Sequence, residues 1–252
     1  MTSRRDLEAS HTPAAIRARL DGGPDHSYLR DFVYGAIDGA VTTFAVVAGA
    51  TGANLSAGLV LVFGLANLAA DGFSMAVSNY LGTRAEEQRR ERLSAEEHAQ
   101  VRAIPEGERE EVRQIFEAKG LSGDALDQVV DAITSDEDVW VDTMLREEHG
   151  LPSDGQSATR AALSTFVAFM LAGSVPLVVF VVDLVVPGAI PGNVIWWSAG
   201  MTAVTFFGTG VAKARVVERR WWSSGLETLA LGGGAALLAF AVGWLLRGLA
   251  DA

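Results

Sequence analysis

The chain has 252 residues, of which 49% are hydrophobic and 20% are charged, and its formal net charge is −11. It contains no cysteine, which excludes disulfides and thiolate metal sites. The mean hydropathy is nevertheless positive, at +0.23, which argues against an ordinary soluble domain unless apolar and charged residues are segregated along the chain.

The charged residues are concentrated in one stretch. Between Glu86 and Asp154 lie 20 of the 31 acidic residues but only 8 Lys or Arg, so this stretch carries a net charge of −12. The rest of the chain is close to neutral and mostly apolar. This pattern predicts a membrane body with one soluble acidic module, which would attract cations and repel nucleic acid.

The N-terminal residues 1–30 are polar and lack an apolar core before Phe32. We therefore expect no cleavable signal peptide in this segment. We expect a short cytosolic tail that is partly disordered.

Five windows are apolar over the roughly 20 residues that a helix needs to cross a bilayer. They are Phe32–Ala53, Ala57–Tyr80, Ala161–Val182, Ile190–Ala212 and Thr228–Leu246. Arg and Lys gather on one side of this arrangement, with only Arg247 on the other, so the N-terminus and the module are predicted to face the cytosol. The predicted fold class is all-α, a polytopic membrane protein with five transmembrane helices and an inserted cytosolic helical metal-binding domain.

Four regions follow from this prediction. They are a cytosolic tail (1–30), spans one and two (31–85), the acidic helical domain (86–155) and spans three to five (156–252).

Gly35 and Gly39 in the first span are four residues apart and would allow another helix to approach closely. Packing inside one subunit and a dimer contact are both consistent with this pair.

The acidic domain contains only helical signals. The second span continues as a polar helix to about Ala103, Pro105 starts a new helix, and Gly120 follows its end. Ser122 begins a further helix and Ser135 caps the last one. The residues predicted to form a small core are Val112, Ile115, Phe116, Val139, Trp140 and Met144.

Ionisable residues inside membrane spans are costly and mark functional sites. Asp38 and Asp71 are such residues, and Asp31, seven residues before Asp38, shares its helix face. Met75 lies one turn after Asp71, and carboxylates with a thioether suit a divalent first-row metal. Packing or lipid contact for Met75, and a structural or proton-binding role for Asp38, are the alternatives.

Carboxylates of the acidic domain recur at helical spacings and could form a cage for divalent cations. The candidate ligands are Glu97, Glu108, Glu111, Met144 and Glu148. The alternative is a set of solvated helix faces. His98 and His149 are further ligand candidates or surface residues, and neither completes a Glu-x-x-His motif of the kind that ferroxidase sites use.

Three segments are distinctive: residues 30–39 (RDFVYGAIDG), 44–50 (FAVVAGA) and 68–81 (LAADGFSMAVSNYL). They resemble the vacuolar iron transporter family, which includes the nodulin-like iron transporters. The likeness runs from Asp31 over nearly the whole chain and includes the run PEGEREE at 105–111. The insert resembles that of members with a cytosolic metal-binding domain.

The resemblance implies a homodimer with an ion path at the subunit interface, which exports Fe²⁺, and often Mn²⁺, from the cytosol in exchange for protons. It implies a transporter, not an enzyme, with Fe²⁺ as substrate and no prosthetic group. Asp38 and Met75 match intramembrane metal-handling residues, and Asp31 lies near the cytosolic entrance. The residues that match the metal-collecting cage are Glu97, Glu108, Glu111, Met144 and Glu148.

Three positions depart from the family pattern. Gln100 replaces a cage glutamate, Leu145 replaces a second methionine, and Asn67 replaces a glutamate of span two. Asp71, one turn after Asn67, could restore that charge.

We therefore predict a multi-pass Fe²⁺ transporter driven by proton antiport, with Mn²⁺ as a second candidate substrate. Its partners would be the bilayer, divalent metals, protons and a second copy of the chain. The Ala-, Arg- and Gly-rich composition favours a bacterial plasma membrane. The alternative function is a membrane-anchored metal buffer or ferroxidase-like iron-binding protein.

Overall fold

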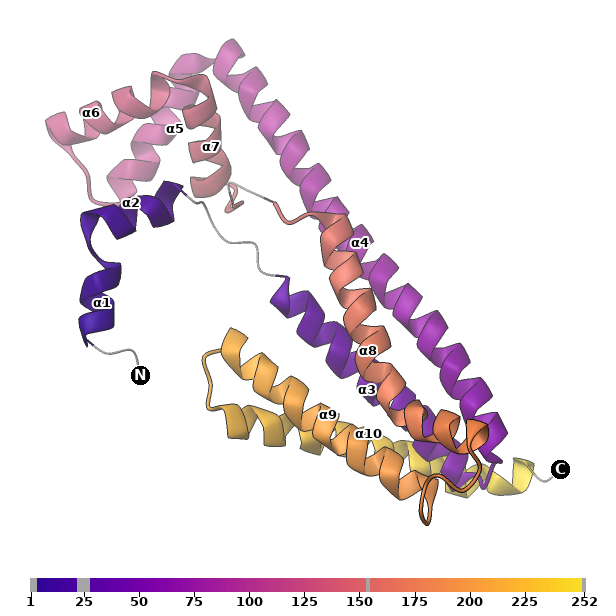
Figure 1. The fold of residues 1–252 in the computed structure, drawn as a ribbon. Coiled ribbons are helices and arrows are strands. Elements are labelled where there is room, and N and C mark those ends of the chain that lie inside the picture. The colour runs from indigo at the N-terminus through magenta and orange to yellow at the C-terminus, as the bar shows by residue number, and fades with distance from the viewer. Residues whose placement is uncertain (1–3, 22–27, 153–154, 251–252) are drawn as a thin grey trace. The chain divides into compact units, whose positions relative to one another are not determined.

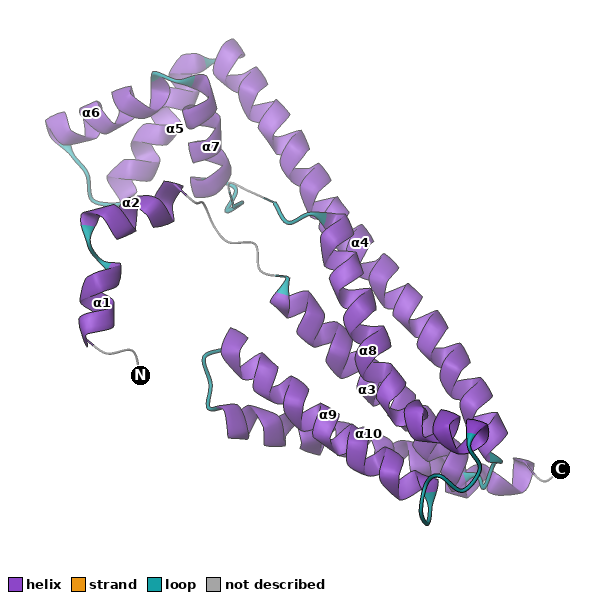
Figure 2. Ribbon diagram, in the orientation of Figure 1, coloured by secondary structure: helices purple, strands orange, loops and turns teal. Residues whose placement is uncertain are grey.

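All regular secondary structure in the described part of the chain is helical. The computed structural model describes residues 4–21, 28–152 and 155–250, which contain ten helices and no strand (Figures 1 and 2). The helices are α1 (Arg4–Ser10), α2 (Pro13–Asp21), α3 (Leu29–Gly52), α4 (Ala57–Ala103), α5 (Pro105–Ala118), α6 (Gly123–Thr134), α7 (Glu137–Glu147), α8 (Ala158–Val185), α9 (Val194–Val216) and α10 (Trp221–Ala250). The all-α prediction is confirmed.

Five helices, α3, α4, α8, α9 and α10, are long and apolar enough to cross a membrane. The chain is a multi-pass membrane protein, as predicted. The predicted fifth span, Thr228–Leu246, lies inside α10, which begins earlier, at Trp221, because a helix can extend beyond its apolar stretch. The helix α9 begins later than the predicted Ile190, because Asn193 caps it and accepts the Ile195 N–H at 2.9 Å.

The chain divides into two compact units. Within the described residues, the membrane unit comprises 28–83 and 157–250, and the acidic module comprises 4–21, 84–152 and 155–156. The helix α4 contributes to both units, because its first part up to residue 83 is apolar and the remainder is charged.

Glycines bring α3 directly against α8 in the membrane unit. A Cβ on Gly35 would collide with the backbone oxygen of Thr165, and one on Gly39 would lie 2.9 Å from the Cα of Phe169. The two helices therefore touch backbone to backbone, as their adjacent ribbons in Figure 1 indicate. The structure decides between the two interpretations of this glycine pair in favour of packing inside one chain.

The core of the acidic module is formed by α4, α5, α6 and α7. Val112, Val130 and Met144 are fully buried there, together with the side chain of Trp140. The prediction that Val139 joins this core was wrong: its side chain is 48% exposed. The buried face of α7 runs through Trp140 and Met144, one turn apart, so Val139 points away from it.

The last helix of the module is capped by Asp136 and not by Ser135 as predicted. Asp136 Oδ1 accepts the N–H groups of Asp138 at 2.9 Å and Val139 at 3.2 Å. Ser135 still has helical backbone angles, and its hydroxyl donates to the Ala132 carbonyl at the end of α6. Only Asp136 has the extended backbone that an N-cap needs.

The other predicted helix limits in the module are confirmed. Pro105 is the first residue of α5, Gly120 follows the end of that helix with φ of +96°, and Ser122 precedes α6. In the N-terminal tail, α1 and α2 were not predicted.

Candidate metal sites

The two carboxylates inside the spans, Asp38 on α3 and Asp71 on α4, lie close enough to repel each other. Both side chains are half-buried in the single chain. A bilayer interior offers no water to solvate two neighbouring charges. Two negative charges at this place would therefore be unfavourable.

Met75 lies one helical turn after Asp71 and is half-buried. It packs against an apolar cluster that includes Leu68 and Phe169. Packing thus explains part of its environment, and a role as a metal ligand stays a prediction.

Asp31, at the start of α3, is held by a polar network. Asn79 Nδ2 on α4 donates to Asp31 Oδ1 at 3.0 Å and to Thr165 Oγ1 on α8 at 2.7 Å. Asp31 Oδ2 is buried, and no donor among the described residues reaches it. Sequence analysis missed Asn79 as a partner of Asp31, although Asn79 lies one turn after Met75 in the quoted span-two segment.

Asn67 lies one turn before Asp71 on the same face of α4. Its side-chain Nδ2 is buried without an acceptor in the described part of the chain. Asn67 therefore has an N–H donor that is not in use among the described residues, one helical turn from Asp71.

Two buried glutamates lie together in the acidic module. Glu97 on α4 is 3% exposed and Glu108 on α5 is 2% exposed, and their carboxyl groups are in contact. Burial raises the pKa of Glu108 to about 7, and repulsion by Glu111, Glu97 and Glu148 adds to this shift. Glu97 and Glu108 lie on α4 and α5, whose apolar faces form part of the module core. Packing of this core therefore positions both glutamates.

The remaining predicted cage residues differ in their surroundings. Glu111 interacts electrostatically with Glu148 and Glu97, so four of the five predicted residues converge. Met144 is fully buried in the apolar core of the module. Its role as a ligand stays a prediction.

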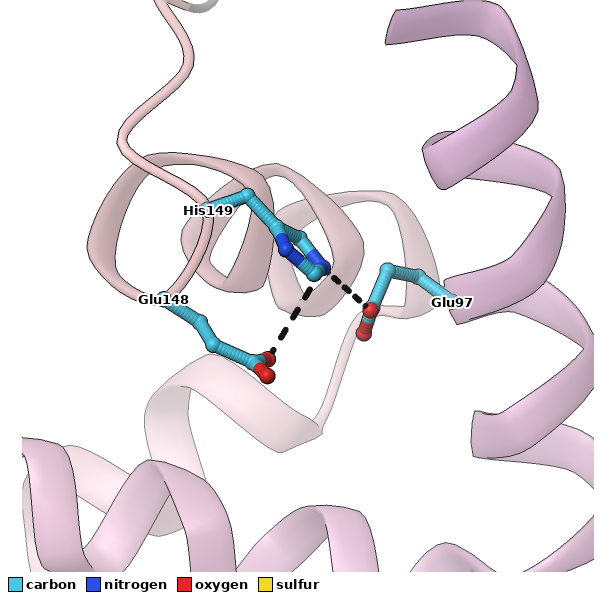
Figure 3. Close-up of side chains that lie close together, drawn as sticks. All are labelled: Glu97, Glu148 and His149. Carbon is cyan, nitrogen blue, oxygen red and sulfur yellow. Dashed lines mark hydrogen bonds and ion pairs between the residues drawn. The ribbon is translucent and has the colours of Figure 1, made fainter. Parts of the chain in front are cut away.

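His149 also belongs to this cluster. Its Nε2 lies 2.8 Å from Glu97 Oε1 and 3.9 Å from Glu148 Oε2, and Figure 3 shows the ring directed between the two carboxylates. One ligand atom from each of these three residues lies within 4.8 Å of the other two. His98 instead bonds Glu137 through Nδ1 at 2.9 Å. The sequence did not separate the two histidines, because each directly follows a candidate ligand, His98 after Glu97 and His149 after Glu148.

A model of the VIT family matches residues 29–244, which is most of the chain and includes both candidate sites. The chain belongs to the VIT family. This confirms the resemblance found in the sequence.

The chain is similar to curated members of the VIT family along most of its length. It is 32% identical to vacuolar iron transporter 1 of Arabidopsis thaliana over 84% of this chain and 83% of the relative. It is 31% identical to the vacuolar iron transporter of Toxoplasma gondii over 96% of this chain and 85% of the relative. Vacuolar iron transporter 1 of Eucalyptus grandis is 30% identical over 84% of each chain. The VIT likeness therefore covers membrane unit and module alike.

Proposed function

We propose that this VIT-family protein exports Fe²⁺ from the cytosol in exchange for protons, with Mn²⁺ as a second substrate. The names of its relatives, which are vacuolar iron transporters, support iron as the cargo. The proposal assigns Fe²⁺ as substrate and needs no prosthetic group or catalytic residue.

The observation that carries the proposal is the pair Asp38 and Asp71. These carboxylates come from two different spans and repel each other inside the membrane unit. A divalent cation can neutralise both at once, and so can protons. Binding of one species would then release the other, which is the elementary step of an antiporter. Met75, one turn from Asp71, would add a soft thioether ligand that favours a transition metal.

The module would collect the metal before transport. Glu97 and Glu108 place two carboxylates in a buried position, and Glu111 and Glu148 add negative charge around them. An acidic cluster raises the local concentration of divalent cations at the protein surface. Because the pKa of Glu108 is about 7, protons compete with metal in the cytosolic pH range.

We place the N-terminus and the module in the cytosol. The connection between α9 and α10 and the last turn of α9 contain Lys213, Arg215, Arg219 and Arg220. Basic residues remain on the cytosolic side of a membrane. The C-terminal end of α10, with Arg247, would then face outward, and in a bacterium the membrane would be the plasma membrane.

We further propose a homodimer. In one chain Asp38 and Asp71 are only half-buried, and partly uncovered carboxylates are unfavourable against lipid. A second copy would cover them and enclose the ion path between the subunits. Asp31, tied to Asn79, would lie near the cytosolic entrance of that path.

Flux measurements in proteoliposomes test the transport function. Vesicles with an acidic lumen are supplied with external Fe²⁺ under reducing conditions, and metal uptake and lumen pH are followed together. The parent protein is compared with Asp38→Asn, with Glu108→Gln and with the control Asp183→Asn, which removes a carboxylate near the end of α8. We expect uptake with alkalinisation of the lumen in the parent and control, loss of both in Asp38→Asn, and slower uptake at low Fe²⁺ in Glu108→Gln.

Equal flux in the parent and Asp38→Asn would refute the assignment of the intramembrane site. Uptake without any change of lumen pH would refute proton antiport. Metal binding by the parent without flux would instead favour the membrane-anchored buffer.

A further inference from the structure

Two carboxylate oxygens in the module are buried without a hydrogen-bond donor. These atoms are Glu97 Oε2 and Glu108 Oε2, and no donor among the described residues reaches either of them. Both side chains are more than nine-tenths buried, and their carboxyl groups are in contact. Two touching carboxylates are strongly unfavourable when both are buried and ionised and one oxygen of each lacks a donor, so the pair points to a cation that binds there.

His149 provides a nitrogen donor at the same place. Its Nε2 is 2.8 Å from Glu97 Oε1 and 3.9 Å from Glu148 Oε2, as Figure 3 shows. A first-row metal at about 2.1 Å from its ligands keeps neighbouring ligand atoms about 3–4 Å apart. The three ligand atoms, all within 4.8 Å of one another, need only small side-chain movements to surround one ion.

The backbone after α7 fixes the histidine in this position. The His149 N–H donates to the Met144 carbonyl at 3.3 Å, and Gly150 then turns the chain with φ of +65°. The Leu151 N–H closes the turn on the Leu145 carbonyl at 2.9 Å. These backbone contacts hold residue 149 directly after α7, from where its ring reaches Glu97 on α4.

We propose that His149 is a ligand of the metal bound by the module and sets its preference among divalent cations. The proposal rests on the proposed function, in which the module collects the transported metal. Carboxylates alone suit Mn²⁺ as well as Fe²⁺, whereas an imidazole favours Fe²⁺, Co²⁺ and Zn²⁺. His149 therefore biases capture against Mn²⁺.

X-ray absorption spectroscopy of the full-length protein in detergent tests the ligand directly. The protein is loaded with one equivalent of Co²⁺, an air-stable substitute for Fe²⁺. Its four histidines are His11, His26, His98 and His149. One variant replaces the first three with Gln and leaves His149 alone, and the matched variant is His149→Gln. We expect the outer-shell scattering of an imidazole in the parent and in the His149-only variant, and its loss in His149→Gln.

Competition binding supplies the second measurement. We expect His149→Gln to weaken Co²⁺ and Zn²⁺ binding about tenfold or more, and Mn²⁺ binding by about threefold at most. His98→Gln, which removes a histidine bonded to Glu137 elsewhere in the module, should change none of these affinities.

Two results would overturn the proposal. One is an all-oxygen metal environment in the His149-only variant, a result that does not depend on the folding of His149→Gln. The other is an equal loss of Co²⁺ and Mn²⁺ affinity in His149→Gln, because a purely structural ion pair with Glu97 would affect all metals alike. In either case proton-coupled Fe²⁺ flux by the parent would leave the proposed function intact, whereas absence of flux would refute that function whatever the ligand.

Discussion

At the scale of single residues, both candidate sites bring carboxyl groups together in surroundings poor in water. Asp38 and Asp71, on two membrane spans, lie close enough to repel each other, and Glu108 contacts Glu97 inside a helical module. Such pairs destabilise the protein when both members are ionised and nothing neutralises them. Binding of a cation at either pair would therefore stabilise the folded chain.

The raised pKa of Glu108 gives the metal-free module a defined pH dependence. Because the pKa rises from 4.5 to about 7 on folding, the folded module keeps a proton that the unfolded chain has lost. Its stability should fall as the pH rises through this window and stay low above it. Glu108→Gln should remove this loss, so that the variant is more stable than the parent at pH 8 and similar at pH 4.5.

Trp140, the only tryptophan of the module, reports on this prediction. Thermal unfolding in the presence of a chelator can be followed through its fluorine resonance after incorporation of 5-fluorotryptophan. Glu110→Gln, an exposed change on the same helix, is the control and should leave the pH dependence unaltered. A parent module that becomes more stable between pH 5 and 7 would contradict the assignment.

At the scale of helices, the end of each element depends on a few polar contacts. Asp136 accepts two backbone N–H groups at the start of α7, the helix that precedes Glu148 and His149. Asp136→Ala should destabilise the module by about 1 kcal/mol. Ser135→Ala should change the free energy of unfolding by less than about 0.5 kcal/mol, because Ser135 is exposed and, among the described residues, its hydroxyl donates only to the Ala132 carbonyl at the end of α6.

The same fluorine signal of Trp140 measures both cap variants. If Ser135→Ala proved more destabilising than Asp136→Ala, the N-cap of α7 would be Ser135, as the sequence alone suggested.

The close contact between α3 and α8 leads to a second prediction about the helices. Gly39→Ala would place a Cβ 2.9 Å from the Cα of Phe169, so the two backbones must separate. We expect a loss of about 1–3 kcal/mol, as for other overpacked sites. Gly200→Ala on α9, where nothing lies within 4 Å, should instead stabilise its helix by about 0.5–1 kcal/mol.

Thermal stability in detergent, read from the fraction that stays monodisperse on size-exclusion chromatography, separates the two glycine variants. Equal stability of both would mean that α3 and α8 do not touch through Gly39.

At the scale of the whole molecule, the proposed orientation can be tested because the chain lacks cysteine. Single cysteines can be placed at exposed positions by Asp124→Cys in the module and Gly248→Cys near the C-terminus. A membrane-impermeant thiol reagent should label Asp124→Cys only in inside-out vesicles and Gly248→Cys only in right-side-out vesicles or cells. Labelling of both variants from the same side would contradict the five-span topology.

The sequence by itself determined the fold class, the number of spans and the family. Spans are encoded by continuous apolar runs, and the module by a local excess of acidic residues, so neither requires knowledge of long-range contacts. The candidate carboxylates were found in the same way, because a charge within an apolar run stands out. Their roles in metal binding stay predictions.

Only the tertiary structure decided which side chains meet. His149 and Glu97 are 52 residues apart, and Asn79 and Asp31 are 48 residues apart, so no local pattern connects them. Their contacts depend on how whole helices pack and rotate against one another, and a rotation by one residue moves a side chain by about 100° around the helix axis. The close approach of α3 and α8 at Gly39 also depends on how the helices pack. A glycine in the sequence permits a close contact but does not specify which helix makes it.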